Sequence, residues 1–318
     1  MTEVGILAET PVGSRIRAVP NLVQVTEAAA LSCLRLLGRG EPERVREAAS
    51  AAMLAALQDL GLSGRVVLGP RGDRLSEDMR VGLGEALDLA VYPVEGSSLV
   101  ARGGAGISLL AAAEPGAFPT LPAVWYVDKI VTGPAARGAL DLDDPLSENL
   151  RRIALAKGTR PADLTVAILD RPRHGTTVQE IRDFGARVLL LEEGEIAGAL
   201  LTATPGAGVD VLVGVGGIHE AVLAACGVQC LGGDMQARLY PRNDDERLLA
   251  GPGLDRIYRL ADLAPRPVDL AVTGIGGSAV VGPARAERVG LETDSLVLSS
   301  REGTVRRIHT RHRRAGEA

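Results

Sequence analysis

Apolar positions recur with helical spacing near the start of the chain and then give way to short apolar runs. The helical spacing predicts a helix over residues 25–37 and a second over residues 42–60, which begins at Pro42. The short runs predict three strands, over residues 65–68, 87–91 and 107–113. Helices followed by strands give this first half a mixed, α+β character.

Strands and helices alternate in the second half of the sequence. The pattern predicts helices over residues 145–156, 177–184, 196–201 and 218–225, and strands over residues 164–169, 187–191 and 209–213. Such alternation is typical of an α/β fold with mainly parallel strand pairing. We therefore predict an N-terminal α+β domain over residues 1–150 and a C-terminal α/β domain over residues 151–318.

Composition narrows the class of protein. The 318 residues are enough for two packed cores, and no apolar run approaches the ~18 residues that a membrane helix needs. A formal charge of -5 with 2% aromatic residues disfavours general nucleic-acid binding. The start of the chain lacks the pattern of a signal peptide, and the three cysteines show no zinc-type spacing. We predict a cytoplasmic protein without a membrane or nucleic-acid partner.

A turn that could bind a metal or a phosphate follows the strand near residue 91, at Glu95, Gly96 and Ser97. A carboxylate there can bind a metal, and the serine hydroxyl and the backbone N–H groups can hold a phosphate. A plain surface turn explains the same residues, and the residues alone favour that simpler interpretation.

Basic residues follow the strand that ends near residue 169, at Arg171, Arg173 and His174. Ligands of α/β sheets bind beyond the carboxyl ends of the strands, so these side chains are a candidate anion clamp. A solvated basic loop is the alternative.

Two glycine-containing segments complete the set of candidates. Residues 214–217 are read as a glycine turn between a strand and a helix, which favours phosphate binding, with His219 and Glu220 beyond it. Glu193, Gly194 and Glu195 can accept sugar hydroxyls, or they are simply an acidic helix start.

Taken in order, several segments resemble the class II (GlpX-type) fructose-1,6-bisphosphatases, from Val25 to about Ile308. The matching stretches are VTEAAAL, LGRG, AVYPVEGSS, YVDKIVTGP, DLDDPLSENLRRIALAKG, ILDRPRH, GVGGIHE, GGDMQARL and TVRRI. The resemblance implies a sugar-phosphatase fold, a layered αβαβα sandwich shared with inositol monophosphatases. It also implies a homo-oligomer that removes the 1-phosphate of fructose 1,6-bisphosphate, or acts on sedoheptulose 1,7-bisphosphate, with Mg²⁺ or Mn²⁺.

The resemblance extends to residues that bind the sugar phosphate in this family. The positions retained, or replaced conservatively, are Glu95, Gly96, Ser97, Tyr126, Arg171, Arg173, Glu193, Gly194, Glu195 and Gly217. Glu220 matches the distal metal ligand, so Glu95 and Glu220 are the residual candidates for holding a metal.

Most of the family's other metal-site carboxylates are replaced. Arg46 stands where the family has an aspartate in its second helix, and Tyr92 stands where it has the aspartate that precedes Pro93. The family's Gly-Glu-Gly-Glu-Ile-Asp motif aligns with Gly69-Pro70-Arg71-Gly72-Asp73-Arg74, which removes both glutamates and the catalytic aspartate. Asp73, Glu77 and Asp78 are the nearby carboxylates that a shifted site would use.

Three functions follow from this pattern. The favoured hypothesis is a protein that binds a phosphorylated sugar without ordinary metal-dependent hydrolysis and regulates or partners an active homologue. The first alternative is an active sugar phosphatase with a rearranged Mg²⁺ or Mn²⁺ site. The second alternative is a metal-free enzyme such as an isomerase, with acid–base groups among His174, His219, Glu95 and Tyr92.

Overall fold

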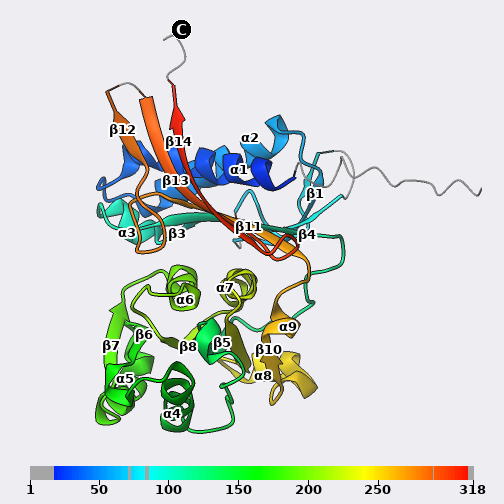
Figure 1. Ribbon diagram of the computed structural model, residues 1–318. Coiled ribbons are helices and arrows are strands. Elements are labelled where there is room, and N and C mark those ends of the chain that lie inside the picture. Colours follow the sequence, from blue (N-terminus) through cyan, green and yellow to red (C-terminus); the bar gives the residue numbers. More distant parts are fainter. Residues whose placement is uncertain (1–17, 71–72, 83–85, 289, 314–318) are drawn as a thin grey trace, which may run out of the picture.

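The chain forms five stacked layers, which alternate between helices and sheets (Figure 1). The computed structural model describes residues 18–70, 73–82, 86–288 and 290–313. One helix pair covers the outer face of an eight-stranded sheet, a second pair lies between the two sheets, and further helices cover the outer face of a six-stranded sheet. This αβαβα sandwich confirms the predicted fold class.

The first helical layer consists of α1 (Ala18–Cys33) and α2 (Pro42–Asp59). Both helices bury apolar side chains against the first sheet, since Val25, Val45 and Met53 are fully buried in one cluster with Leu89 of the sheet. The predicted helices at these positions are confirmed, although the last residues of the first one form a 3₁₀ turn, η1 (Leu34–Leu36).

The first sheet has the strand order β12-β13-β11-β4-β3-β1-β2, and β14 pairs with β13. Only β1 and β3 pair in parallel; the other neighbours are antiparallel. The strands are β1 (Gly64–Leu68), β2 (Arg80–Val81), β3 (Asp88–Glu95), β4 (Ile107–Ala113), β11 (Val268–Gly274), β12 (Arg285–Glu287), β13 (Gly290–Ser299) and β14 (Thr304–His312).

The middle layer consists of α6 (Glu195–Ala203) and α7 (Ile218–Cys230). A helix between two sheets is buried on nearly all sides, which explains why apolar residues predominate in both sequences. Gly227 lets the two helices approach closely, because a Cβ atom there would lie 2.1 Å from a methyl group of Leu200.

The second sheet has the order β10-β9-β5-β8-β6-β7. The prediction of mainly parallel pairing is wrong here, since β5 runs antiparallel to both β8 and β9, and β9 runs antiparallel to β10. Parallel pairing is limited to β6 with β7 and β8, where crossover helices connect the strands. The strands are β5 (Tyr126–Thr132), β6 (Thr165–Leu169), β7 (Arg187–Leu191), β8 (Val211–Gly217), β9 (Asp234–Tyr240) and β10 (Ile257–Arg259).

The outer layer and the connections contain the remaining elements. They are α3 (Ser97–Ala101), η2 (Pro134–Ala136), α4 (Leu146–Lys157), η3 (Pro161–Asp163), η4 (Pro172–His174), α5 (Gly175–Asp183), α8 (Asp244–Ala250), η5 (Gly251–Gly253) and α9 (Leu260–Leu263). No helix in the described ranges is both long enough and apolar enough to cross a membrane.

The two sheets are not separated at residue 150. Strand β5 precedes that position but belongs to the second sheet, and the chain returns to the first sheet with β11 to β14. The division into domains at residue 150 stays a prediction. Each sheet contains strands from both sides of that position.

The predicted glycine turn at residues 214–217 is strand instead, and so is Glu95 of the earlier predicted turn. Strand β3 continues beyond Val91 to Glu95, and β8 continues through the glycines to Gly217. Strand β8 pairs with β5 along this whole stretch, from Thr132↔Val211 to Tyr126↔Gly217, and these ladder hydrogen bonds hold the glycines in the strand, Gly214 with a φ of +120°.

Candidate functional site

A cavity of about 390 Å³ lies where the ends of β3 and β8 meet the start of β5. Its lining residues are Pro70, Tyr92, Trp125, Tyr126, Gly217, Ile218, His219 and Glu220. The cavity therefore collects side chains from both sheets and from the start of α7.

Glu95, at the end of β3, is bonded to the start of α6. Its two carboxylate oxygens accept hydrogen bonds from the backbone N–H groups of Ile196 and Ala197, at 2.6 Å and 3.0 Å. Burial raises the pKa of Glu95 to about 8, against the effect of these two donors, and the charges of Glu195 and Glu220 add to the rise. Both oxygens of this predicted metal ligand are thus engaged within the protein.

Tyr92 and Glu220 form the wall of the cavity. The Tyr92 hydroxyl donates a hydrogen bond of 2.8 Å to the Glu220 carboxylate, in the first turn of α7. Burial, followed by the nearby carboxylates of Glu220 and Glu95, raises the pKa of Tyr92 far above its usual value. The phenol therefore stays protonated and remains a donor to Glu220.

Glu195 is paired with Lys129 in the interior. Their side chains are only 8% and 1% exposed, and the Lys129 ammonium also lies 3.4 Å from the Gly214 carbonyl oxygen. Sequence reasoning missed Lys129, although it is one of two lysines in the chain and lies in the matching stretch YVDKIVTGP. Glu195 would have to give up this ion pair with Lys129 to take the predicted sugar-binding role.

The glycines at the end of β8 make room for these glutamates. A Cβ atom at Gly216 would lie 1.7 Å from a carboxylate oxygen of Glu195, and one at Gly217 would lie 1.9 Å from a carboxylate oxygen of Glu220. At these positions the absence of a side chain explains the glycines.

A glycine is also required in the turn after Glu95. Gly96 has a φ of +83°, and a Cβ atom there would lie 2.9 Å from the Ala105 carbonyl oxygen. Ser97 then begins α3 and accepts a hydrogen bond of 2.9 Å from Arg46. The predicted turn therefore places a serine hydroxyl beside a guanidinium.

Arg173 lies in η4 and reaches toward the cavity. Its Nε and Nη2 atoms donate to the Val215 carbonyl oxygen at 3.3 Å and 2.8 Å, and its guanidinium carbon lies 5.3 Å from the centroid of the Tyr126 ring. Arg171 instead donates to the Asp170 carbonyl oxygen. Neither arginine is among the lining residues, and the contact with the Tyr126 ring is what distinguishes Arg173.

His174 is buried, and both of its ring nitrogens are bonded to backbone. Nδ1 lies 2.8 Å from the Leu169 carbonyl oxygen, and Nε2 accepts from the Val215 N–H at 2.9 Å. A carbonyl can only accept, so Nδ1 carries the proton, and burial lowers the pKa of the ring. This neutral histidine holds η4 against β8 and does not face the cavity.

Glu95 lines a second, smaller cavity of about 140 Å³. Gly96, Glu193 and Gly194 line it too, with mainly apolar neighbours, among them Leu99 and Val280. The predicted site residues are therefore divided between two cavities, and Glu95 lines only the smaller one.

Arg242 is a further residue at the cavity rim that sequence reasoning missed. Its guanidinium carbon lies 4.6 Å from the Trp125 ring centroid and 5.9 Å from that of Tyr126. Glu246 holds the side chain by accepting from Nε at 2.7 Å. Only the arrangement of β5 beside β9 brings these residues together, and no local pattern indicates it.

The nearby carboxylates do not assemble into a metal site. Asp73 accepts from the Ser50 hydroxyl at 2.6 Å, Glu77 pairs with His219 at 2.9 Å, and the Asp78 side chain is 90% exposed. Within the described ranges, no group of three or more His, Cys, Asp or Glu side chains is arranged to hold a metal ion. Arg71 and Gly72 lie outside the described residues, and neither carries a carboxylate. The residues present do not fit a divalent cation.

Comparisons with known proteins identify the family. The family model described as bacterial fructose-1,6-bisphosphatase, glpX-encoded, matches residues 17–312. Fructose-1,6-bisphosphatase 1 class 2 of Escherichia coli K12 is 35% identical over 315 residues, which cover 91% of this chain and 93% of the relative. The class 2 enzyme of Shigella flexneri gives the same values. The predicted resemblance is confirmed, and the chain belongs to the bacterial, glpX-encoded fructose-1,6-bisphosphatase family.

Proposed function

We propose that the chain binds a phosphorylated sugar in the 390 Å³ cavity without ordinary Mg²⁺- or Mn²⁺-dependent hydrolysis. The observation that carries this proposal is the engagement of the two residual ligands, Glu95 by backbone N–H groups of α6 and Glu220 by the Tyr92 hydroxyl. Hard cations near a phosphoryl group need several free carboxylate oxygens, and this site offers few.

Arg46 supplies positive charge where the family relies on a carboxylate-bound cation. Its hydrogen bond to Ser97 places a guanidinium at the turn that the resemblance assigns to phosphate binding. A guanidinium can bind phosphate oxygens, but it does not lower the pKa of a bound water as a metal does. The arrangement therefore supports binding more than hydrolysis.

The cavity has the size and chemistry for a sugar ligand. A volume of about 390 Å³ lies within the usual range for small-molecule sites, and the rings of Tyr92 and Tyr126 line it beside the Glu220 carboxylate. Arg173 and Arg242 lie against the aromatic rim and supply charge for an anionic group. The relatives are named fructose-1,6-bisphosphatases, so we propose fructose 1,6-bisphosphate as the first ligand to test.

The two alternative functions have less support. A rearranged metal site needs Asp73, Glu77 and Asp78 to converge, but each has another partner or is exposed. A metal-free isomerase loses His174 as an acid or base, because both ring nitrogens are bonded to backbone. Tyr92 and Glu220 would remain as its acid–base pair.

Assembly and location are part of the same proposal. We propose a cytoplasmic homo-oligomer that regulates or partners an active homologue. Mixing the purified chain with an active class 2 enzyme should then change that enzyme's rate, which a phosphate-release assay measures.

A paired binding and turnover experiment tests the proposal. Trp125 is the only tryptophan and lines the cavity, so its fluorescence should change when fructose 1,6-bisphosphate binds. Arg173→Gln should weaken that binding, whereas Arg171→Gln, a matched charge change outside the cavity, should leave it nearly unchanged. Phosphate release should stay at background over a panel of sugar phosphates, with and without Mg²⁺ or Mn²⁺. Efficient metal-dependent release would refute the proposal.

A further inference from the structure

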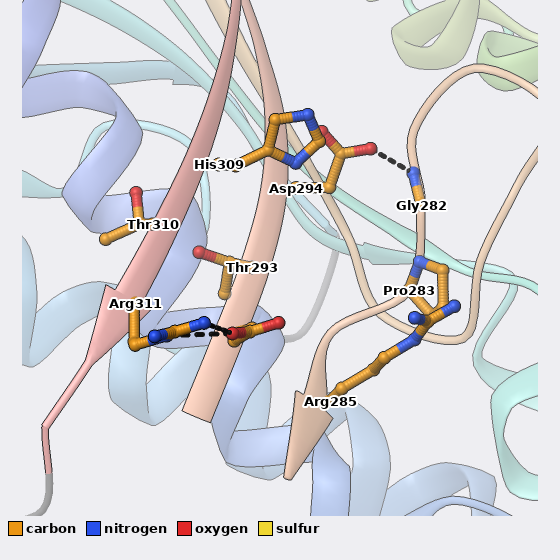
Figure 2. Close-up of a pocket in the computed structure, with 9 residues that line it drawn as sticks. Gly282, Pro283, Arg285, Thr293, Asp294, His309, Thr310 and Arg311 are labelled. Carbon is orange, nitrogen blue, oxygen red and sulfur yellow. Dashed lines mark hydrogen bonds and ion pairs between the residues drawn. The ribbon is translucent and has the colours of Figure 1, made fainter. Parts of the chain in front are cut away.

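A large cavity lies away from this site, on the first sheet (Figure 2). Its volume is about 590 Å³, and it is formed by the β13–β14 hairpin, β12 and the segment before β12. Figure 2 shows His309, Thr310 and Arg311 on β14 beside Thr293 and Asp294 on β13, with Pro283 and Arg285 on the neighbouring segment. No large apolar side chain lines this cavity, so its ligand must be polar.

Two arginines, two carboxylates and one histidine line the walls. Glu292 on β13 has Arg285 opposite it on β12 and Arg311 opposite it on β14, so two arginines flank this carboxylate. The other carboxylate, Asp294, pairs with Arg307 of β14, which does not itself line the cavity. Three arginines therefore stand against two carboxylates, and one guanidinium is left over.

The carboxylates of the cavity are already neutralised. Glu292 accepts from Arg311 at 2.9 Å. Asp294 accepts from the Gly282 N–H at 2.5 Å and from both Nε and Nη2 of Arg307. Although burial acts in the opposite direction, these bonds hold the pKa of Asp294 below its usual value. Neither carboxylate is left to repel an anion strongly.

Arg285 is the group that the protein leaves available. Among the residues that the structure describes, its guanidinium has no hydrogen-bond or ion-pair partner, and its side chain lines the cavity. The Thr293 hydroxyl already donates to Glu27, and His309 lies 3.3 Å from Asp294. The Arg285 guanidinium and the Thr310 hydroxyl together suit an anion that also accepts hydrogen bonds from neutral donors.

We propose that this cavity is a second binding site, for a small phosphate monoester, with Arg285 as its principal anion contact and Arg311 and His309 beside it. A monoester dianion matches the unpaired guanidinium. The volume is several times that needed for a phosphate group alone, which leaves room for the organic part of the ligand.

The segment before β12 connects this cavity with the candidate site. Gly282, Pro283 and Arg285 line the large cavity, while Ser278, Ala279 and Val280 of the same segment line the small cavity beside Glu95. A monoester bound at Arg285 therefore contacts the segment that forms one wall of the site around Glu95. We infer that occupancy of the second site alters the affinity of the first.

Calorimetric titration with inorganic phosphate and with glycerol 3-phosphate tests the second site. The full chain carrying Arg173→Gln serves as background, because this change weakens the sugar cavity. We expect glycerol 3-phosphate to bind in this background without a change in Trp125 fluorescence, since Trp125 lies at the other cavity. Adding Arg285→Gln should raise the Kd about tenfold, as expected for a lost charge-assisted hydrogen bond.

Arg306→Gln is the matched control. Arg306 lies on β14 with the lining residues His309 and Arg311 and pairs with Glu302 at 2.7 Å, but the strand alternation points it to the face opposite those two side chains. This variant should keep the Kd within about twofold. Equal weakening of binding by Arg285→Gln and Arg306→Gln would overturn the proposal. An absence of glycerol 3-phosphate binding to the Arg173→Gln chain would also overturn it. So would displacement of glycerol 3-phosphate by a short single-stranded oligonucleotide.

The connection between the sites has its own test. Glycerol 3-phosphate should change the Kd for fructose 1,6-bisphosphate, followed by Trp125 fluorescence, in the otherwise unmodified chain and should change it less in Arg285→Gln. Competition inside the sugar cavity would act equally on both proteins. An equal effect in the two would therefore overturn the connection.

Discussion

Replacement of Lys129 by methionine should destabilise the protein far more than replacement of the other lysine, Lys157. Lys129 is 1% exposed and forms its ion pair with Glu195, which is 8% exposed. Removing one partner of a buried pair leaves an uncompensated charge and costs about 3–5 kcal/mol. Lys157 also has a carboxylate partner, Asp210 at 2.9 Å, but the two side chains are 28% and 17% exposed. Loss of such a more hydrated pair costs about 1 kcal/mol or less.

Thermal unfolding measures the difference between these two variants. An unfolding entropy of about 2.1 cal/mol/K per residue, over 318 residues, amounts to roughly 0.7 kcal/mol/K. A loss of about 4 kcal/mol should then lower the Tm of Lys129→Met by about 6 °C, provided that the chain unfolds in one step. Lys157→Met should lower the Tm by less than about 2 °C.

The pH dependence and a double variant test the cause. Burial raises the pKa of Glu195, and without Lys129 that carboxyl group should be neutral in the folded state at low pH. A raised folded-state pKa gives stability that is lost as the pH rises, so the deficit of Lys129→Met should grow from pH 5 to pH 8. Adding Glu195→Met removes the orphaned charge and should restore most of the lost Tm. Equal and small losses for the two lysine variants would refute this account, because they would show that water reaches the Lys129–Glu195 pair.

Three further predictions concern the candidate site. The double change Arg46→Asp, Tyr92→Asp makes the site more negative by three charges. We expect calorimetry to detect Mn²⁺ binding to this variant that the unmodified chain lacks. Identical Mn²⁺ titrations of the two proteins would contradict the electrostatic argument. Because burial raises the pKa of Glu95 to about 8, the free energy of unfolding should fall as the pH rises from about 4.5 to 8. Glu95→Gln should reduce that slope in urea titrations, and an unaltered slope would assign it to other groups. His174→Ala should cost about 1–3 kcal/mol in the same assay, because it leaves the Val215 N–H and the Leu169 carbonyl without partners.

Elements with local periodic patterns were predictable from the sequence, and elements stabilised by distant partners were not. Helix α2 and strand β4 match their predicted ranges within a residue or two. Strand β5 was missed because Asp128 and Lys129 interrupt its apolar pattern, and Lys129 is compensated only by a glutamate far along the chain. Strand β14 was missed because its residues are mostly exposed, so burial imposes no alternation of apolar and polar positions.

The same distinction applies to the candidate site. The sequence pointed to Glu95 and Arg173 because each follows a predicted strand, and their role in a site stays a prediction. The bond from Tyr92 to Glu220 joins a strand of the first sheet to the first turn of α7, so no local pattern indicates it. His174 looked like a ligand in the sequence because a histidine beside two arginines suits an anion site, and burial alone shows its structural role.

The antiparallel pairing of β4 with β11 has a consequence for synthesis of the chain. About 150 residues separate Ala113, the last residue of β4, from Val268, the first of β11. At usual rates of translation the ribosome needs about 8–30 s to make that stretch. During this interval the apolar β4 lacks the neighbour that closes its edge in the finished sheet, and unpaired apolar edges attract other chains. The nascent protein should therefore depend on a chaperone that shields β4 until β11 emerges.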